Sequence, residues 1–399
     1  MKNHKQAPIS ESIHAIISAE QEKGNQINNL SFTDYSSYES LLERGKIQRA
    51  FTNIYKYPHY FPTAKGEGEA LLAIADYYKR RGEKVDPENL LLTSGLHHSL
   101  LFLFQLLTRA AKSNSDVILI PRPYSPSLME IADFLEIQPG TFPLDPDNDW
   151  QIDLAALRKA IKPQTKAILL GSPHLPTGAV QSAETLEKIA QLARENGLFL
   201  IIDESQSDYL YGKTKLPKIS ELTSEKDQLL VIALHSLSDS LALPGLKISW
   251  LRFHGPQSAC QSICQKLEMV ADTFLSINQL GQTVLPELFK YSRGWRKTLQ
   301  KHLTKNRQIL IDAIGKNSKI TLTHPAGGLY TLAQIDTILS DEDLVIELIE
   351  RTGTYYHPGA FYGLPATEKR KPYLIIDLFQ SPALLKKSLK KLVSYLQPR

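Results

Sequence analysis

The sequence contains only two cysteines, Cys260 and Cys264, in 399 residues. Two cysteines cannot supply the disulfide framework that holds small secreted domains together, and no histidine spacing beside them is typical of a zinc site. They stand four positions apart in an expected helix, so they share one face of it. The sequence therefore indicates reduced thiols in a cytoplasmic protein without a metal site.

Long apolar runs are also absent. No stretch of about 18 apolar residues occurs, so we expect no membrane-spanning helix, and the opening MKNHKQAPISESIHAII lacks the continuous apolar run of a signal peptide. Neither sign of charge dominates, because 46 lysines and arginines against 42 aspartates and glutamates give a net charge of +4. This weak excess is spread along the chain, which argues against a nucleic-acid groove.

What the sequence does contain is a repeated alternation of apolar runs and amphipathic segments. The apolar runs that we expect to be strands are 90–95, 116–120, 166–171, 198–203, 229–234 and 246–251. The helical stretches between them include 97–111, 125–135, 153–161 and 182–195. This alternation predicts an α/β fold with a mostly parallel sheet sandwiched by helices. Such sheets bind ligands at the carboxyl ends of their strands, so functional residues should follow the runs.

The length exceeds what one compact core usually holds, which predicts more than one domain. We expect an N-terminal arm over residues 1–50, a large domain over 51–290 and a smaller α+β domain over 291–399. The arm contains a helix over 9–22 and packs with the small domain. Further expected elements are helical structure over 255–290, helices over 292–315, 341–352 and 381–396, and strands over 319–324, 328–335 and 373–379.

One segment carries a specific resemblance. Residues 236–251 read SLSDSLALPGLKISWL. They resemble the class I/II, fold-type-I, pyridoxal-phosphate-dependent aminotransferases, which have Ser-x-Ser-Lys, four residues, then Pro-Gly-Leu-Arg-x-Gly-Trp at this register. The family's lysine forms the Schiff base with the cofactor and shuttles a proton. Here Asp239 stands in the position of that lysine, and Lys247 replaces the arginine.

The resemblance covers about residues 8 to 397 and implies a set of cofactor-binding positions. Backbone amides after a strand would hold the phosphate at a helix N-terminus, an aromatic ring would stack on the pyridine, and a carboxylate would pair with the pyridine nitrogen. A tyrosine, for which Tyr57 or Phe61 are alternatives, would reach across a homodimer to the phosphate. The positions are Gly95, Leu96, His97, Tyr124, Asp203, Ser236, Ser238, Lys247 and Tyr60.

Several positions depart from the family pattern. Ser172 and Leu175 replace two asparagines, and Gln206 replaces a tyrosine. Ile375 stands where the resemblance places the arginine that grips the substrate carboxylate. Leu175, Gln206 and Ile375 would therefore line an altered substrate pocket. The groups of the family that perform transamination are replaced, while those that hold a phosphate persist.

Asp239 is the tentative catalytic residue. Its carboxylate cannot form an imine, but it could act as a general base or pair with an ammonium group. Alternatively, it is a vestigial polar residue capped by backbone N–H groups. Asp203 should face the same cavity, and two carboxylates there would favour a cation or an amine. Of the nearby histidines, His97 would contribute mostly its backbone N–H.

Three functional hypotheses follow. The first is a non-transaminating homologue, a pseudoenzyme or ligand-binding homodimer with no covalently bound cofactor. The second is an enzyme that holds pyridoxal phosphate or pyridoxamine phosphate non-covalently, or that uses cofactor-free acid–base chemistry through Asp239. The third is a protein-binding regulator. A small phosphate-bearing or amine ligand fits the first two, and conventional transaminase activity is predicted to be absent.

Overall fold

The computed structural model describes residues 9–31, 44–52, 63–109, 115–274, 277–315 and 317–397. The chain divides into two compact units. The large unit comprises Tyr38–Gln300 and Ala326–Gly328, and the small unit comprises Met1–Ser37, Lys301–Pro325 and Leu329–Arg399. No helix among the described residues is long and apolar enough to cross a membrane.

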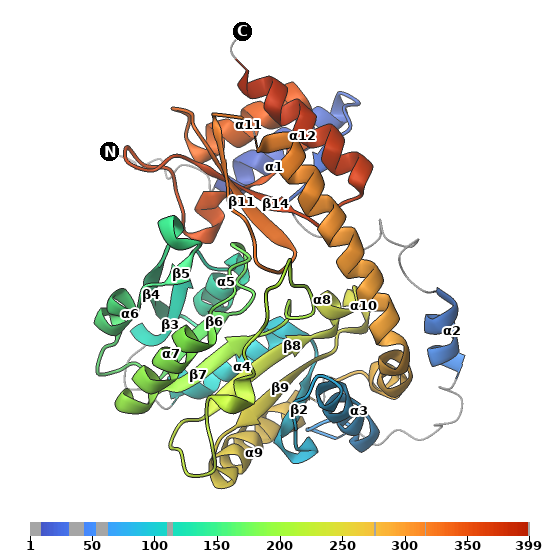
Figure 1. The fold of residues 1–399 in the computed structure, drawn as a ribbon, viewed down its shortest axis with the longest axis vertical. Helices are drawn as coiled ribbons and strands as arrows, with labels where there is room; N and C mark the ends of the chain where they lie inside the picture. Colours follow the sequence, from blue (N-terminus) through green and yellow to red (C-terminus); the bar gives the residue numbers. More distant parts are fainter. Residues whose placement is uncertain are drawn as a thin grey trace. The chain divides into compact units, whose positions relative to one another are not determined.

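The large unit is built on an eight-stranded sheet (Figure 1). The strands, in sheet order, are β2 (Leu90–Thr93), β9 (Ser249–His254), β8 (Val231–Ser236), β7 (Phe199–Asp203), β6 (Ala167–Gly171), β3 (Ser115–Arg122), β4 (Gln138–Asp145) and β5 (Gln151–Ile152). β9 is antiparallel to both of its neighbours and β5 to β4, whereas the other pairs are parallel. The sheet is therefore mostly parallel, as predicted.

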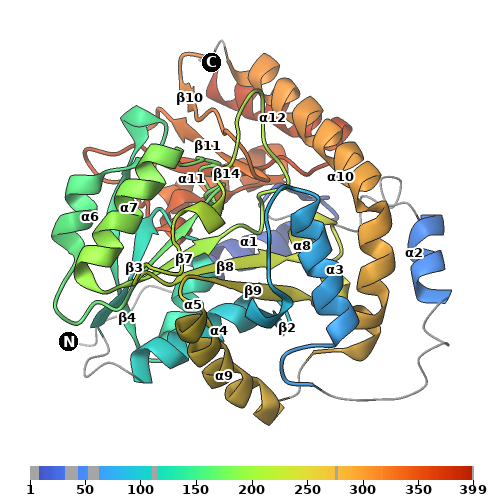
Figure 2. The ribbon, with the colours of Figure 1, turned by 60° about the horizontal axis from the view of Figure 1, so that its bottom comes forward.

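Helices cover the sheet, which explains why its strands are continuous apolar runs. Every residue of β2 and β8 is buried, as expected for strands that are covered on both faces. The covering helices of the large unit include α3 (Gly68–Lys79), α4 (Leu96–Arg109), α5 (Pro126–Phe134), α6 (Leu154–Ala160), α7 (Ala183–Asn196) and α9 (Gln257–Phe274). α4 and α9 share one hydrophobic cluster with the sheet, and Figure 2 shows them on the same face.

Local sequence signals set the ends of these helices. The side chain of Ser182 accepts a hydrogen bond from the backbone N–H of Thr185, which caps the start of α7. Gly197 ends the same helix with φ of +61°, a left-handed conformation that glycine adopts without strain. These two residues bound the apolar stripe of α7 that packs on the core.

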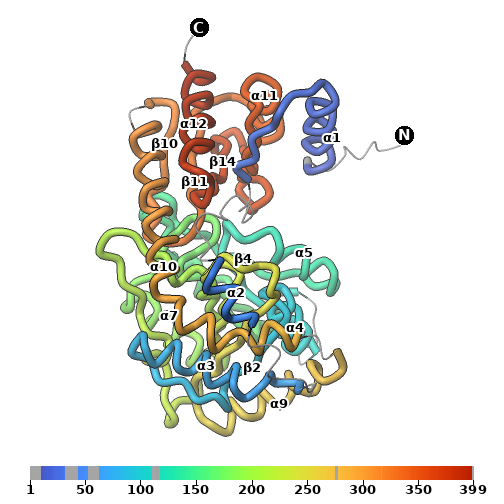
Figure 3. The backbone as a smooth tube through the Cα atoms, turned by 90° about the vertical axis from the view of Figure 1, so that its right-hand side faces the viewer, coloured from blue at the N-terminus to red at the C-terminus, as the bar shows by residue number. Residues whose placement is uncertain are grey.

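The small unit contains a four-stranded antiparallel sheet, β10 (Ile320–Leu322), β11 (Tyr330–Ile335), β14 (Tyr373–Asp377) and β13 (His357–Pro358). A two-stranded parallel pair joins β1 (Asn28–Asn29) to β12 (Thr354–Tyr355). The described helices of this unit include α1 (Ile9–Glu22), α11 (Asp341–Thr352) and α12 (Pro382–Leu396). α1 lies beside α11, as Figure 3 shows, so the N-terminal segment folds with C-terminal elements.

The helix α10 (Gln279–Ile314) differs from the sequence expectation. The sequence predicted a separate helix over 292–315, but one continuous helix begins at Gln279 and contains Pro286. A proline inside a helix removes one backbone hydrogen bond and does not have to end the helix. A short helix, α2 (Arg44–Thr52), begins in the stretch that the sequence assigned to the arm and extends past its predicted end at residue 50.

Candidate functional site

Three of the predicted site segments follow strands that end at one edge of the large unit's sheet. Gly95 follows β2, Asp203 is the last residue of β7, and α8 (Leu237–Ser240) follows β8. β7 is parallel to β8, and β2 points the same way as β8 because both are antiparallel to β9. This edge is where parallel sheets bind ligands.

The junction between β2 and α4 has the geometry of an anion site. Gly95 has φ of +107°, and its chain neighbours aside, no described residue has an atom within 4 Å of the position that a Cβ would take there. α4 is 14 residues long, starts at Leu96 and has no acidic residue in its first turn. The first amide groups of a helix have no acceptor within the helix, and its dipole favours negative charge. The N–H groups of Leu96 and His97 therefore suit a phosphate.

Asp203 lies in an environment that opposes its ionisation. Its Oδ1 accepts a hydrogen bond of 2.8 Å from the backbone N–H of Ser205. Burial raises the pKa of the Asp203 carboxyl, and the hydrogen bonds from Ser205 and the charge of His97 lower it in part. The sequence assigned His97 to the site mainly through its backbone N–H, as part of the phosphate cradle.

The turn that carries Asp239 is held at both ends. At its start, the Oγ of Ser236 accepts a 3.1 Å hydrogen bond from the backbone N–H of Ser238. At its end, the phenolic hydroxyl of Tyr209 lies 3.0 Å from the carbonyl oxygen of Asp239 and 2.8 Å from that of Ser240. Ser236 thus accepts a hydrogen bond within its own turn. Its hydroxyl hydrogen can still be donated to an anion.

Tyr209 was not predicted as a site residue. The sequence interpretation assigned it to the core or to a subunit interface, and its side chain is indeed fully buried. Its neighbour Asp208 anchors the same loop, because its carboxylate contacts Arg81, Arg296 and the hydroxyl of Tyr77. A lone tyrosine in a sequence does not reveal which distant carbonyl its hydroxyl reaches.

Lys247 is an exposed cation with a special backbone conformation. It ends the short 3-10 turn Pro244–Leu246 with φ of +50°, in the left-handed region. Within the described part of the chain, its ammonium group forms no ion pair. A charge without a protein partner is available to an anionic ligand.

The remaining predicted residues lie in varied surroundings. Tyr124 is half-buried against the hydrophobic cluster that includes α4 and α9. Gln206 is buried, and its Oε1 lies 2.5 Å from where a Cβ on Gly328 would fall. Leu175 is partly buried, and Tyr60 lies outside the described residues. Ile375 lies on β14 in the small unit and is fully buried, as a core residue of that sheet.

The loop after β6 supplies no titrating group at neutral pH. His174 is buried, its Nδ1 lies 2.9 Å from the hydroxyl of Thr177, and burial lowers its pKa to about 3. The Oγ of Ser172 is buried and has no hydrogen-bond partner among the described residues. The described residues also contain no group of three or more side chains suited to a metal ion.

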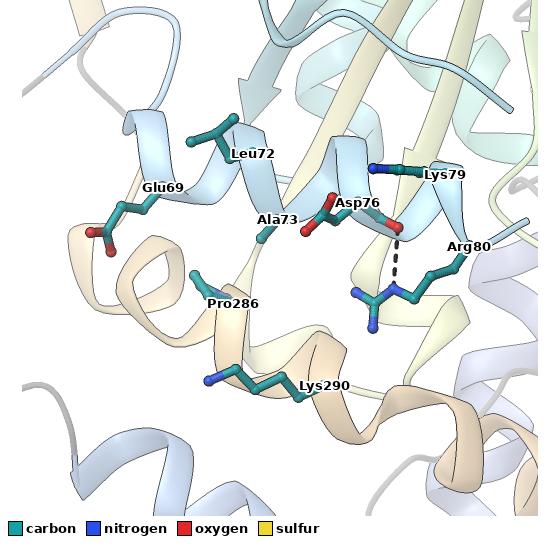
Figure 4. Close-up of a pocket in the computed structure, with 8 residues that line it drawn as sticks. All are labelled: Glu69, Leu72, Ala73, Asp76, Lys79, Arg80, Pro286 and Lys290. Carbon is teal, nitrogen blue, oxygen red and sulfur yellow. Dashed lines mark hydrogen bonds between the residues drawn. The ribbon is translucent and has the colours of Figure 1, made fainter.

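A groove of about 650 Å³ lies elsewhere on the large unit, between α3 and α10 (Figure 4). Figure 4 shows the hydrogen bond from the Nε of Arg80 to the carbonyl oxygen of Asp76 at one end. The groove is lined by Glu69, Leu72, Ala73, Asp76, Lys79, Arg80, Pro286 and Lys290. None of the predicted site residues is among them, so the groove is separate from the candidate site.

Comparison with known proteins identifies relatives. The family model "Aminotransferase class I and II" matches residues 28–370. Tyrosine aminotransferase of Dictyostelium discoideum is 25% identical over 348 residues, which cover 84% of this chain and 80% of the relative. Glutamate-pyruvate aminotransferase AlaA of Escherichia coli is 25% identical over 313 residues, which cover 76% of this chain and 75% of the relative.

A solved structure shows the same fold. Alanine aminotransferase from Pyrococcus furiosus superposes with a TM-score of 0.87, covers 98% of both chains and is 21% identical in sequence. This similarity confirms the predicted fold class, a fold-type-I architecture with a mostly parallel sheet flanked by helices and a smaller α+β part. At this level of identity, it is the fold that the two proteins have in common.

Proposed function

Because the chain belongs to the aminotransferase class I and II family, we propose that it is a member that binds a ligand without attaching a cofactor to a lysine. The single observation that carries this proposal is the aspartate at position 239, in the first turn of α8 directly after β8. A carboxylate cannot condense with an aldehyde, whereas the amine of a lysine can. Conventional transamination is therefore absent from the proposed function.

The described residues suit the phosphate end of the family's cofactor but not the end that is linked covalently. For the phosphate, the open space at Gly95, the start of α4 and the exposed ammonium of Lys247 are suited to an anion. For the covalent link, position 239 provides no amine. When bound, a pyridoxal-type group supplies an electron-withdrawing ring. The residues support non-covalent binding of such a group and no covalent step.

The two carboxylates favour a ligand that carries positive charge as well as phosphate. Burial opposes ionisation of Asp203, and a cationic nitrogen beside it would offset that cost. Asp239 would pair with a free ammonium group in the place where the family's lysine amine stands. Pyridoxamine phosphate combines a phosphate, a ring nitrogen and a free amine. We therefore propose a ligand of this class, and a second copy of the chain as the partner in a homodimer.

One observation favours a second candidate function. The turn of α8 is fixed through Ser236 and Tyr209, so Asp239 starts from a backbone that is already ordered. A fixed carboxylate is what a general base requires. In this alternative, Asp239 takes a proton from a non-covalently held substrate, and the protein is an enzyme without transaminase activity.

The experiment is a retention assay on purified protein. The protein is incubated with pyridoxal phosphate and separately with pyridoxamine phosphate, then desalted, and its absorbance is recorded near 330 and 390 nm, rough values for these cofactors. The proposal predicts retention of pyridoxamine phosphate and no turnover of amino acids with 2-oxo acids. Steady transamination by the wild-type protein would refute it. Asp239→Asn distinguishes the alternatives. Weaker retention of pyridoxamine phosphate supports pairing of Asp239 with the ligand amine, whereas unchanged retention with loss of a non-transaminating activity supports the general base.

A further inference from the structure

A polar cavity lies at the edge of the large unit's sheet that is opposite to the candidate site. Its volume is about 300 Å³. Its walls come from the segments that precede β2 and β8 and from the turn after β9. Val231, at the start of β8, pairs with His254, at the end of β9, so these segments meet at the amino ends of the parallel strands. We name this cavity the amino-edge cavity. None of the predicted site residues lines it.

Two residues of its lining each have a buried polar atom with no hydrogen-bond partner among the described residues. These atoms are the Oδ1 of Asn89 and the Nε2 of His254. The Nδ2 of Asn89 donates a 3.0 Å hydrogen bond to the Oε1 of Gln257, which fixes the amide and leaves its oxygen unbonded. An unpaired polar atom shielded from water is costly, and native proteins supply such atoms with a partner. Both atoms therefore indicate a missing group.

The cavity lining offers several acceptors beside the hydroxyl residues Ser220, Thr223 and Ser224. Burial lowers the pKa of His254 to about 3, so its imidazole is neutral and its Nε2 can accept a hydrogen bond. The carboxylates of Asp86 and Glu225 also line the cavity, and the ammonium of Lys84 is the lining cation. Each carboxylate accepts one backbone hydrogen bond and retains acceptor capacity. Two negative charges thus outweigh one positive charge.

We propose that the amino-edge cavity binds a small molecule with a primary ammonium group, which donates hydrogen bonds to Asn89 and His254. An ammonium has three donors and no acceptor, which complements this set of acceptors. Its charge complements the excess of carboxylates at the cavity's rim. The volume is at the lower limit of small-molecule sites, so the ligand is an alkylamine or an amino compound of similar size.

Water is the alternative occupant of the cavity. The two occupants can be distinguished by how binding depends on the charged side chains at the rim. A cluster of waters would satisfy the same two atoms without depending on the net charge of the rim. An ammonium ligand is attracted by Glu225 and repelled by Lys84. Both side chains are exposed, so they can be changed without disturbing the core. Opposite effects of these two substitutions would be specific to a cationic ligand.

The experiment measures binding of n-butylammonium to the full chain by isothermal titration calorimetry. 1-Butanol and butyrate serve as neutral and anionic probes of matched size. The proposal predicts measurable binding of the ammonium and none of the other two. It further predicts weaker binding in Glu225→Gln and tighter binding in Lys84→Gln, each by about two- to fivefold, the range for a partly exposed ion pair. His254→Phe, which keeps a ring but no acceptor, should also weaken binding.

Three results would overturn the proposal. The first is no binding of n-butylammonium at millimolar concentration. The second is equal binding of n-butylammonium and 1-butanol. The third is binding that changes in the same direction, or not at all, in Glu225→Gln and Lys84→Gln. A thermal melt of each variant identifies any that has lost the fold.

Discussion

The phenolic hydroxyl of Tyr209 donates a hydrogen bond to the carbonyl oxygen of Asp239, at a distance of 3.0 Å. The same hydroxyl lies 2.8 Å from the carbonyl oxygen of Ser240. Tyr209 follows β7 and Asp239 follows β8, so this contact joins two neighbouring segments at the carboxyl edge of the sheet. Asp239, on which the proposed function rests, is thus held by a side chain from the adjacent loop.

Removing this hydroxyl should loosen the turn of α8. We expect Tyr209→Phe to lower the free energy of unfolding by about 1–3 kcal/mol, because the carbonyl groups of Asp239 and Ser240 lose the one hydroxyl that they share. Urea titration measures this change. Tyr211→Phe is the matched control, since its buried hydroxyl donates to the carbonyl oxygen of Gly328 instead. Amide hydrogen exchange of residues 237–243 should accelerate in Tyr209→Phe and not in Tyr211→Phe; equal rates would contradict the role of Tyr209.

Asp208 should be a major anchor of the same loop. The charges of Arg81 and Arg296 hold the pKa of its buried carboxyl below the ordinary value, despite the opposing effect of burial. Asp208→Asn should destabilise the protein by about 1–3 kcal/mol at pH 7, because it leaves two partly exposed arginines without their charged partner.

The pH dependence of this effect has a defined sign. A carboxyl whose pKa is lower in the folded state stabilises the protein at pH values above its unfolded pKa of about 4. This stabilisation is lost as the pH falls through the pKa of the folded state. The difference between wild type and Asp208→Asn should therefore shrink in acid. Unfolding titrations at pH 7 and pH 3 test this expectation, with the exposed Asp133→Asn as the control. A difference that grows in acid would show that the carboxylate is not paired.

His174 should contribute to acid sensitivity. Its pKa is lowered to about 3 by burial, whereas an unfolded histidine titrates near about 6.5. The unfolded state therefore binds a proton first as the pH falls below that value, and stability decreases. In His174→Gln, the free energy of unfolding should depend less steeply on pH between 6 and 4, roughly the window between the two pKa values. The exposed His324→Gln should leave the slope unchanged.

Lys247 should contribute to phosphate binding. We expect Lys247→Gln to weaken retention of pyridoxamine phosphate by about two- to fivefold, because an exposed cation is screened by solvent. Equilibrium dialysis at low and high salt measures the effect, which should decrease at high salt. Lys188→Gln, which removes an exposed lysine on α7 paired with Glu184, is the control. Equal retention by wild type and Lys247→Gln would show that Lys247 does not contribute to phosphate binding.

The sequence predicted most of the sheet, because its strands are buried on both faces and appear as continuous apolar runs. β7, for example, was expected over 198–203 and extends from Phe199 to Asp203. The alternating and partly exposed β4 was missed, since its Gln138–Asp145 sequence contains glycine and prolines. The antiparallel direction of β9 could not be predicted either, because an apolar run has no direction.

The sequence identified the segments of the candidate site, but not the side-chain contacts that hold them. The spacing of Ser236, Asp239 and Lys247 identified the segment after β8, which the structure places at the carboxyl edge of the sheet. The hydroxyl of Tyr209 and the carboxylate of Asp208 depend on side chains from other elements, and one sequence holds no signal for such pairing.

The most direct test of the central claim is covalent trapping of pyridoxal phosphate. Wild type and Asp239→Lys are incubated with pyridoxal phosphate, reduced with borohydride and digested, and the modified peptides are identified by mass spectrometry. We predict stoichiometric modification at position 239 in Asp239→Lys and no stoichiometric modification of any lysine in the wild type. Stoichiometric modification of one lysine in the wild type would contradict the account, because another residue would then replace the missing amine.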